Sequence, residues 1–588
     1  MPPQSVWETE EMKTAASIEA STRAAPKDFL THAEKSQWRE TGTYDEAIAF
    51  YRKLERTSRF ARLIPIGQTA EGRDLYALAV SKDRAFTAQA AARTGKPVVL
   101  LQNGIHAGEN GGKDAAMMLL RDILVTRRFE AWLDRVIVLS IPVFNADGHE
   151  RVSPFNRVNE NGPAAMGFRV TAQRLNLNRD YLKADTPEMR AWLSLYTAWL
   201  PDFLIDNHVT DGSDHQYDVT IATHTEQDIA PEVGKWVDQR YVKRMLAEME
   251  KLGHVTGWYA SFGGRASQSM SVLTASPRFS TGYAAAQNRA SLLVETHSLK
   301  TFRTRAWAHY DIMKVTLDIV AEEAETLKRA SLGADRRMES LKAGDGVFLE
   351  GVPGKTSEPY TLRRLESETY QGIAAGGPVV RYLPSPVNTE TRLVRSLEPK
   401  VNPEAPLGYI VPIAWTSVID LLRAHGVRME TISKPLDATF DSWRFEGVRF
   451  AAAPYEGRFM AREFAAHPVH ERRFIPAGSV YVPVAQRAGK VAMHLLEPEA
   501  PDSALRWGFF ATIFEQKEYF SDYVFEPYAE KMLSADAKLK AEFDAALKSD
   551  PALAKDAHAR LSWLYRRSPY YEYEKDAYPV VRVNRKSW

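Results

Sequence analysis

The sequence has 588 residues and contains no cysteine, which removes several chemistries at once. Disulfides, thiolate metal ligands and cysteine nucleophiles are all excluded. Any bound metal must therefore be held by His, Asp or Glu side chains. The absence of cysteine does not indicate the cellular compartment, because exported and cytosolic proteins can both do without disulfides.

The chain also lacks an excess of charge of either sign. Lys plus Arg (76) nearly cancels Asp plus Glu (75). This balance does not favour a polyanionic partner, so we expect neither nucleic acid nor an anionic membrane surface to bind. Nothing in the composition excludes an oligomer.

Long apolar runs are missing too. No uncharged stretch reaches the length of a membrane span, and candidates such as residues 136–146 are typical of buried strands. The opening Met-Pro-Pro-Gln-Ser lacks a basic start followed by an apolar stretch, so no signal peptide is expected in it. Such a start fits a periplasmic or secreted protein whose leader has been removed, and a cytoplasmic location stays open.

Apolar runs alternate with helical patterns in the first half of the chain. Short runs such as those in 97–104, 135–145, 201–208 and 291–296 are continuously apolar, and segments with helical spacing separate them. This alternation predicts an α/β fold, with a mixed, mostly parallel twisted sheet and helices on both faces.

Three regions are expected from the change of pattern along the chain. Residues 1–40 read as an N-terminal arm, and 41–330 as the catalytic domain. Residues 331–588 read as an accessory region rich in strands, divisible at about residue 440.

The first chemical motif is Gly104-Ile105-His106-Ala107-Gly108-Glu109, which directly follows an apolar strand. His-x-x-Glu places an imidazole and a carboxylate close together, so that both can bind one Zn²⁺. The carboxyl end of a strand is also where α/β proteins build their sites. Alone, the spacing is equally compatible with a loop histidine beside a surface glutamate.

Two further candidates lie at the ends of later strands. His208 ends the strand over 201–208 and could be a third metal ligand, with His215 and His224 as rivals. Glu295 ends the strand over 291–296, where a carboxylate beside a metal could take a proton from water. Each could instead be a structural side chain at a strand terminus.

A fourth motif offers an anion site. Asn178-Arg179 can bind a carboxylate, because the guanidinium binds it bidentately and the amide adds a hydrogen bond. A structural ion pair of Arg179 with Asp180 or Asp206 is the alternative.

Taken together, these motifs resemble the zinc carboxypeptidases of the carboxypeptidase A type. His106-x-x-Glu109, the turn at 145–148, Asn178-Arg179, His208 and Glu295 occur in the order seen in that family. The resemblance covers roughly half of the chain, from about residue 44 to about residue 302. Ala107 and Gly108 stand where the digestive enzymes carry a larger basic residue, which indicates a bacterial-type relative.

The resemblance implies roles for named residues. His106, Glu109 and His208 would bind one zinc ion, and Glu295 would be the general base. Asn178 and Arg179 would hold the terminal carboxylate of a substrate. Arg169, with Arg174 as rival, would stabilise the oxyanion, and Tyr283 would line the specificity pocket. These are expectations from the resemblance, and the side-chain preference of the digestive enzymes does not carry over.

The implied function is a zinc metallocarboxypeptidase that releases C-terminal amino acids. One alternative is a zinc amidohydrolase of the same fold, acting on N-acyl amino acids or cell-wall peptides. Another is a non-catalytic binding module that keeps the fold. The expected partner is a peptide or N-acyl amino acid with a free carboxylate.

The accessory region gives no chemical assignment. Tyr570, Tyr571 and Tyr573 are expected in a core rather than on a contact surface. His467, His470 and Glu471 suggest a second metal site only weakly, because Pro468 interrupts them and no third partner is evident.

Overall fold

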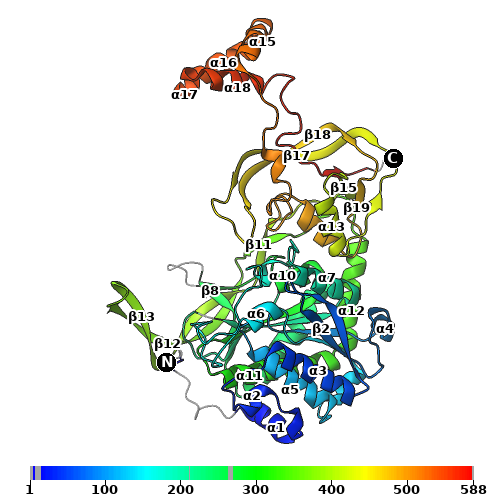
Figure 1. Ribbon diagram of the computed structural model, residues 1–588, viewed down its shortest axis with the longest axis vertical. Coiled ribbons are helices and arrows are strands. Elements are labelled where there is room, and N and C mark those ends of the chain that lie inside the picture. Colours follow the sequence, from blue (N-terminus) through cyan, green and yellow to red (C-terminus); the bar gives the residue numbers. More distant parts are fainter. Residues whose placement is uncertain (1–3, 7–14, 211, 263–268, 586–588) are drawn as a thin grey trace.

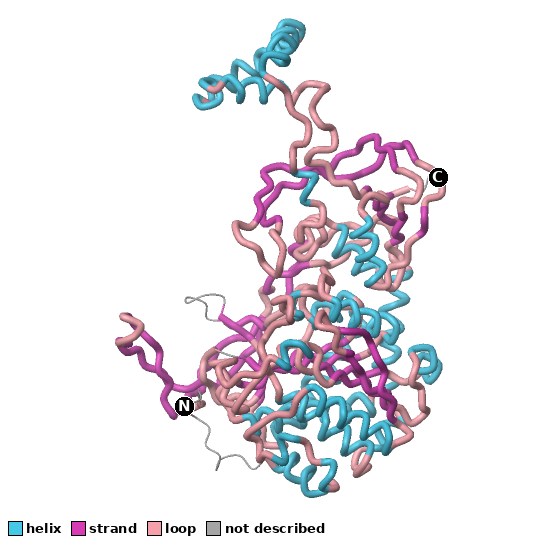
Figure 2. Tube along the Cα trace, viewed as in Figure 1, coloured by secondary structure: helices cyan, strands magenta, loops and turns pink. Residues whose placement is uncertain are grey.

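The computed structural model describes residues 4–6, 15–210, 212–262 and 269–585. Its longest axis runs from a large α/β part through a second, strand-rich part to a helical cluster that stands apart (Figure 1). The tube in Figure 2 shows mixed helices and strands at one end and helices alone at the other.

An eight-stranded sheet forms the centre of the first part. Its order is β1-β2-β4-β3-β5-β10-β6-β7. The bounds are β1 (Ala61–Gln68), β2 (Asp74–Val80), β3 (Val98–Gln102), β4 (Ile137–Ile141), β5 (Phe203–Thr210), β6 (Val219–Ala222), β7 (Thr256–Trp258) and β10 (Ala290–His297). The pairs β4–β3, β3–β5, β5–β10 and β6–β7 are parallel, and the other three are antiparallel. The mixed, mostly parallel sheet expected from the sequence is confirmed.

Helices cover both faces of this sheet because its strands are apolar on both sides. Val99 and Leu101 of β3 join one core, which also holds α5 (Gly111–Leu124) and α11 (Phe302–Glu322). Leu100 belongs to a second core on the opposite face, together with residues of α7 (Pro187–Trp199). Successive residues of a strand point to opposite faces, so a continuous apolar run requires cover on both.

The remaining helices of the first part are mostly short. Their bounds are α1 (Ala16–Ala24), η2 (Lys27–Phe29), α2 (His32–Lys35), α3 (Tyr44–Thr57), α4 (Ala88–Thr94), η3 (Glu130–Asp134), α6 (Ala146–Glu150), η4 (Leu177–Arg179), α8 (Pro231–Trp236), η5 (Val237–Val242), α9 (Lys243–Lys251), α10 (Ser280–Ala286) and α12 (Ala324–Glu339). The N-terminal segment is anchored by Arg121 of α5, whose buried guanidinium bonds to Glu34 and to the Phe29 carbonyl.

A long hairpin returns from the later chain to the first part. Strands β12 (Ser357–Gly372) and β13 (Gly377–Val394) pair with each other, and β13 pairs in parallel with β9 (Ser269–Val272). Strand β8 (Ala260–Phe262) completes this sheet, and the hairpin projects from the body (Figure 1). The boundary at about residue 330 stays a prediction, and the hairpin shows that chain beyond it pairs with strands before it.

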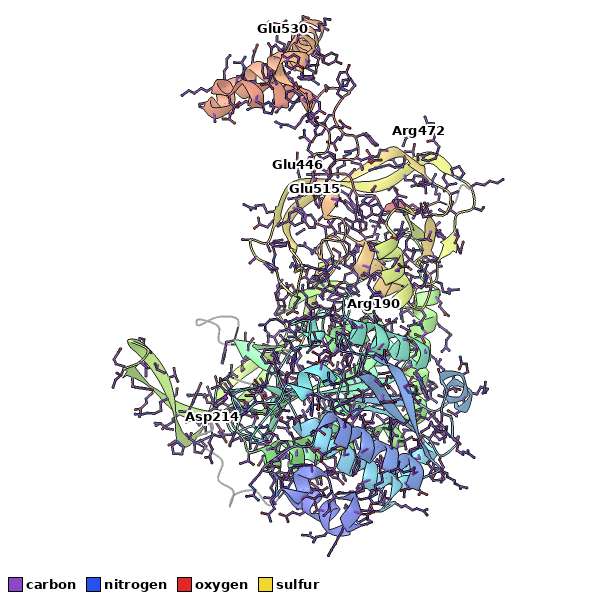
Figure 3. All side chains as sticks on the ribbon, viewed as in Figure 1. Arg190, Asp214, Glu446, Arg472, Glu515 and Glu530 are labelled. Carbon is purple, nitrogen blue, oxygen red and sulfur yellow. The ribbon has the colours of Figure 1, made fainter. Side chains whose placement is uncertain are left out.

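The second part is built on a six-stranded sheet of order β16-β19-β15-β20-β17-β18. Its elements are β15 (Gly408–Val411), β16 (Glu430–Thr431), β17 (Leu436–Phe450), β18 (Ala461–Ile475), β19 (Val480–Pro483) and β20 (Val581–Val583), with helices α13 (Thr416–Ala424), α14 (Gly489–Leu496) and η6 (Ala511–Phe514). A two-stranded sheet of β11 (Glu350–Pro353) and β14 (Leu397–Val401) lies between the parts along the chain. Figure 3 labels Glu446 of β17 and Arg472 of β18 on the outer strand pair.

The helical cluster has a core of its own. It consists of α15 (Asp522–Ala535), α16 (Ala537–Ser549), α17 (Pro551–Lys555) and α18 (Ala557–Tyr565). Its buried side chains are Phe525, Ala529, Phe543, Leu561, Leu564 and Tyr565. The expectation that Tyr570 and Tyr573 belong to a core is wrong, because both are more than half exposed, at 61% and 53%.

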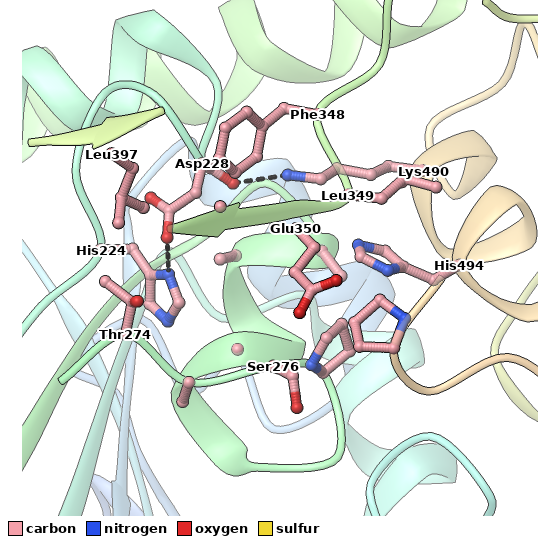
Figure 4. Close-up of a pocket in the computed structure, with 17 residues that line it drawn as sticks. His224, Asp228, Thr274, Ser276, Phe348, Leu349, Glu350, Leu397, Lys490 and His494 are labelled. Carbon is pink, nitrogen blue, oxygen red and sulfur yellow. Dashed lines mark hydrogen bonds and ion pairs between the residues drawn. The ribbon is translucent and has the colours of Figure 1, made fainter. Parts of the chain in front are cut away.

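The second part packs against the first through a shared core and a polar junction. Val418 and Val491 belong to the same core as Leu100. A cavity of about 120 Å³ lies at this junction, and the Lys490 ammonium donates across it to the carbonyl oxygen of Asp228 (Figure 4). Among the described residues, no helix combines the length and the apolar character needed to cross a membrane.

Candidate metal centre

Three candidate ligands come from the carboxyl ends of two neighbouring parallel strands. His106 and Glu109 lie in the loop after β3, and His208 lies in β5. Gly104 begins this loop with a φ of 62°, a conformation that favours glycine. A Cβ there would also lie 3.1 Å from Val143 Cγ1, so the sharp turn that brings His106 back to the strand end needs glycine.

The ligand atoms of these three side chains converge on one point. The Nδ1 atom of His106 lies 3.0 Å from Glu109 Oε1, and that of His208 lies 3.1 Å from Glu109 Oε2. The two Nδ1 atoms are 3.2 Å apart. All three side chains are buried. Among the described residues this is the one group of three or more His, Asp or Glu side chains with ligand atoms close enough to share an ion.

The far side of each imidazole is held by a hydrogen bond. His106 Nε2 lies 3.1 Å from Asn176 Oδ1, and His208 Nε2 lies 2.7 Å from Asp206 Oδ2. Both acceptors favour a proton on Nε2, so that each ring, when neutral, offers its Nδ1 lone pair to a cation. Two neutral imidazole nitrogens and one carboxylate are a donor set that catalytic zinc uses, so the residues present fit the metal.

The electrostatics of the cluster also suit a cation. Burial would raise the pKa of Glu109, but the adjacent His106 ring and the charge of Arg157 outweigh it and hold that pKa well below its usual range. Burial lowers the pKa of His106 to about 4, which keeps this ring neutral. Burial also opposes the charged form of His208, but Asp206 raises its pKa well above the usual value. A cation binding at Nδ1 must therefore displace a proton from His208.

Glu295 of β10 lies beside the cluster. It is the register partner of His208 in the parallel pair β10–β5, and its side chain keeps some contact with solvent. Burial raises the pKa of Glu295 to about 8, with the charge of His208 opposing the shift and that of Glu109 adding to it. A divalent cation at the three ligands would lower this pKa, because it favours the carboxylate.

Two arginines contact the carboxylate of Glu109. Arg169 Nη1 lies 3.2 Å from Glu109 Oε1, so this residue is brought to the centre as expected. Its rival Arg174 is exposed, with its guanidinium 6.0 Å from the centre of the Phe168 ring. The second arginine is Arg157, whose Nη2 lies 2.7 Å from the same oxygen. Sequence reasoning missed it, because no motif marks that loop.

The Asn178-Arg179 pair lies next to His208. Asn178 Nδ2 is 3.3 Å from His208 Nε2, and Asn178 Oδ1 accepts from the backbone N–H of Ser280. Arg179 extends its guanidinium over the ring of Phe279, at 4.2 Å, and is only partly buried. The positively charged Arg179 thus directly follows a residue, Asn178, that contacts one of the three ligands.

Tyr283 is not at this centre, and its expected place in the specificity pocket is corrected. Its side chain is fully buried between the two parts, and its hydroxyl lies 2.9 Å from His425 Nδ1. Helix α10 turns it into the core, where it packs against Trp192. The sequence could not reveal this, because its hydrogen-bond partner lies 142 residues away.

The rival histidines have other partners. The ring of His215 stacks on His297, and His224 pairs with Asp228. In the second part, His470 pairs with Asp441 on the strand pair β17–β18. None of these histidines belongs to the group of three.

Several residues at the centre had no sequence prediction. Asp206 is two residues before His208 in β5, so strand periodicity could have placed both on one face. Asn176 stands two residues before Asn178. Tyr455 and Glu456 come from the second part and could not have been found by spacing. Glu456 Oε2 accepts from the backbone N–H of Asn176, and Tyr455 accepts from Arg179 Nε.

Comparison with known proteins agrees with this geometry. Residues 47–238, which hold all three candidate ligands, match the family model of the zinc carboxypeptidases. The chain thus contains a region similar to zinc carboxypeptidases. This similarity indicates a peptide-bond hydrolase.

The zinc carboxypeptidase match extends beyond the domain in one curated relative. Carboxypeptidase 2 of Trichophyton rubrum is 22% identical over 484 residues, which cover 79% of this chain and 84% of the relative. The alignment therefore includes sequence of the second part.

Solved carboxypeptidase structures are similar to about half of the chain. A carboxypeptidase A from Helicoverpa armigera covers 53% of this chain and 81% of its own, at 16% identity and a TM-score of 0.37. A metallo-carboxypeptidase from Pseudomonas aeruginosa, in complex with (2-guanidinoethylmercapto)succinic acid, covers 49% and 70%, at 14% identity and a TM-score of 0.35.

Proposed function

We propose that this protein is a zinc-dependent metallocarboxypeptidase in which His106, Glu109 and His208 hold the metal and Glu295 is the general base. The observation that carries the proposal is the convergence of two imidazole Nδ1 atoms and one carboxylate within 3.2 Å of each other. When bound, a zinc ion acidifies a water molecule and polarises a carbonyl group. The buried ligands and their hydrogen-bonded imidazoles support this use of the site.

The chain's own residues perform the proton transfers in this mechanism. Glu295 accepts a proton from the water whose oxygen forms a bond with the scissile carbonyl carbon. It then gives that proton to the amine nitrogen as the C–N bond breaks. The register of Glu295 with His208 on the adjacent strand supports this role.

Two arginines have separate roles in the proposal. Arg169 stabilises the negative charge that develops on the carbonyl oxygen, a contribution of roughly 3 kcal/mol per donor. Arg179, with Asn178, orients a substrate by its free carboxylate, which converts binding energy into positioning. A zinc amidohydrolase acting on N-acyl amino acids would use the same residues, and substrate assays separate the two activities.

The test combines zinc loading with the Glu295→Gln variant. We expect the wild-type protein to bind one zinc and to hydrolyse N-acyl dipeptides with a free carboxylate. Glu295→Gln should keep the zinc and lose about 10²–10⁴-fold in kcat, because an amide cannot accept the proton. Elemental analysis gives the metal content, and chromatography of the products gives the rate.

The control is Glu390→Gln, which makes the same chemical change at an exposed position of β13. It should leave kcat unchanged. Normal turnover by zinc-loaded Glu295→Gln would remove Glu295 from the role of base. A zinc-loaded wild-type protein that cleaves neither dipeptides nor N-acyl amino acids would be a binding module.

A further inference from the structure

A tight turn of the second part reaches into the first beside the metal centre. In the segment between β17 and β18, the backbone N–H of Tyr455 donates to the Arg458 carbonyl at 2.9 Å, and that of Arg458 donates back at 3.1 Å. The two residues between them, Glu456 and Gly457, have φ values of 50° and 78°. Two successive positive φ angles in a two-residue loop are the signature of a type I′ turn. We call residues 455–458 the wall turn.

The wall turn contacts the segment that carries Asn178 and Arg179. Glu456 Oε2 accepts from the backbone N–H of Asn176 at 2.8 Å. The Tyr455 hydroxyl accepts from Arg179 Nε at 3.1 Å. Gly457 is close enough to Leu175 that a Cβ on it would lie 3.3 Å from Leu175 Cδ2. Three contacts with one five-residue segment fix the turn against the proposed carboxylate site.

Contacts outside the site hold the wall turn in place. Arg458 forms a bidentate ion pair with Asp185, at 2.7 Å for both bonds. The ring of Tyr455 stacks on Trp507, which is fully buried, with an interplanar angle of 13°. A bidentate pair and a stacked ring restrict both ends of the turn, so it is a fixed surface rather than a loose loop.

We infer that the wall turn closes the substrate site beyond Arg179, so that a peptide ending at that point fits and a longer chain does not. This inference rests on the proposed function and deepens it. One edge of the Arg179 guanidinium is occupied by Tyr455 through Nε, and Nη1 donates to the Asn178 carbonyl at 2.6 Å. A ligand carboxylate must therefore approach the remaining N–H groups. Any residue that followed it would meet the phenol ring and the turn backbone.

The wall turn excludes a longer chain sterically, through the ring of Tyr455, and does not need a hydrogen bond from the Tyr455 hydroxyl to do so. Within the described part of the chain, the Tyr455 hydroxyl has no acceptor for its own proton, and its bond to Arg179 uses only its oxygen. Replacing Tyr455 by Phe keeps the ring and its stacking on Trp507, whereas Ala removes both. Specificity for chain ends thus depends on a side chain that lies outside residues 47–238.

The experiment compares two ligands on the zinc-loaded full-length protein. One is N-benzoyl-glycyl-phenylalanine, and the other is the same compound extended by a C-terminal glycinamide. Mass spectrometry follows cleavage of the glycyl-phenylalanine bond in both. In Tyr455→Ala we expect the ratio of the two kcat/KM values to move toward the extended ligand by about tenfold or more. In Tyr455→Phe the ratio should stay as in the wild type.

The control is Tyr523→Ala in α15, where the tyrosine is 82% exposed. It removes the same atoms far along the chain and should leave the ratio unchanged. If the ratio of the two kcat/KM values in Tyr455→Ala equals that of the wild type, the inference is overturned. A shift of this ratio in Tyr455→Phe as large as that in Tyr455→Ala would overturn it too.

A binding measurement keeps the wall testable if the proposed function fails. Calorimetry on the Glu295→Gln protein gives the affinity for both ligands without turnover. Preferential binding of the shorter ligand, lost in a Tyr455→Ala/Glu295→Gln double variant, supports the wall even if the wild-type protein hydrolyses nothing. Equal affinity for both ligands before the Tyr455 change, or binding of neither at millimolar concentration, overturns it.

Discussion

The two arginines that contact Glu109 differ in their exposure to solvent and in the number of their carboxylate partners. Arg157 is 13% exposed and is bonded to both Glu109 and Glu160. Arg169 is 42% exposed and contacts only one oxygen of Glu109. A guanidinium fixed between two carboxylates holds a ligand in place, whereas a partly exposed one can turn toward a substrate. We therefore propose that Arg157 supports Glu109 and that Arg169 stabilises the oxyanion.

Three alanine variants test this division at the residue scale. Arg169→Ala should lower kcat by about 10²–10³-fold with normal zinc content, because one donor to the oxyanion is lost. Arg157→Ala should instead lower zinc affinity about 10-fold or more, because a partner of a ligand is lost. Arg174→Ala should change neither. Steady-state kinetics and competition with a zinc chelator measure the two effects, and a drop in kcat with Arg174→Ala alone would exchange the assignments.

Helix α5 positions the metal loop at the scale of a whole element. It begins at Gly111, directly after the loop that carries His106 and Glu109, and packs against β5. A Cβ on Gly112 would lie 2.6 Å from Asn207 Cβ, next to His208. The close approach of helix and strand is thus possible only without a side chain at this position.

Gly112→Ala is predicted to separate these two elements. The clash should cost about 1–3 kcal/mol of stability and should also weaken zinc binding, because the ligands lie on both sides of the contact. The matched variant is Gly333→Ala in α12, where a Cβ would meet only the flexible side chain of Glu232, at 3.3 Å. That change should stabilise by up to about 1 kcal/mol, since alanine is the better helix former. Urea unfolding of both variants checks the signs, and equal stability of Gly112→Ala and the wild type would contradict the contact.

The junction between the two parts contains a buried ammonium at the scale of the whole molecule. Burial lowers the pKa of Lys490 to about 8, with the charge of Asp228 opposing the shift. The unfolded chain keeps the ordinary value of 10.5. Between these two values the unfolded state binds more protons than the folded state, so the free energy of unfolding rises with pH in this window.

Lys490→Met should remove this dependence. The free energy of unfolding of the variant, relative to that of the wild type, should fall by about 3 kcal/mol as the pH rises from 7.5 to 10.5. The reason is that a shift of one pKa unit corresponds to about 1.4 kcal/mol. Denaturant unfolding followed by tryptophan fluorescence at several pH values measures the difference. A difference that stays constant across the window would show that Lys490 keeps its proton in the folded state.

Local sequence patterns predicted much of the secondary structure of the first part. Apolar runs over 97–104 and 201–208 predict strands buried on both faces, because a strand covered by helices on both sides carries apolar residues in succession. The resemblance to the zinc carboxypeptidases then named His106, Glu109 and His208 as candidate ligands, at strand ends where α/β proteins build their sites. The number of residues between Glu109 and His208 does not by itself indicate how far apart the two side chains lie in space. Only the adjacency of β3 and β5 brings their ligand atoms to 3.1 Å.

Local sequence patterns could not predict the contacts between segments that are far apart in the chain. Residues 489–496 lie in the region that the sequence predicts to be rich in strands, yet they form helix α14, because the surrounding core decides the conformation of a short apolar segment. Tyr283 is a core residue through a partner 142 positions away. Tyr455 reaches Arg179 across 276 positions.

The sequence alone thus determined the sheet through local periodicity, and it named the candidate ligands and the candidate base through the resemblance of its ordered motifs to a known family. The tertiary structure decided which arginine touches Glu109, which tyrosine faces Arg179 and what bounds the site. These depend on how the two parts pack against each other, and no local pattern of residues encodes that packing.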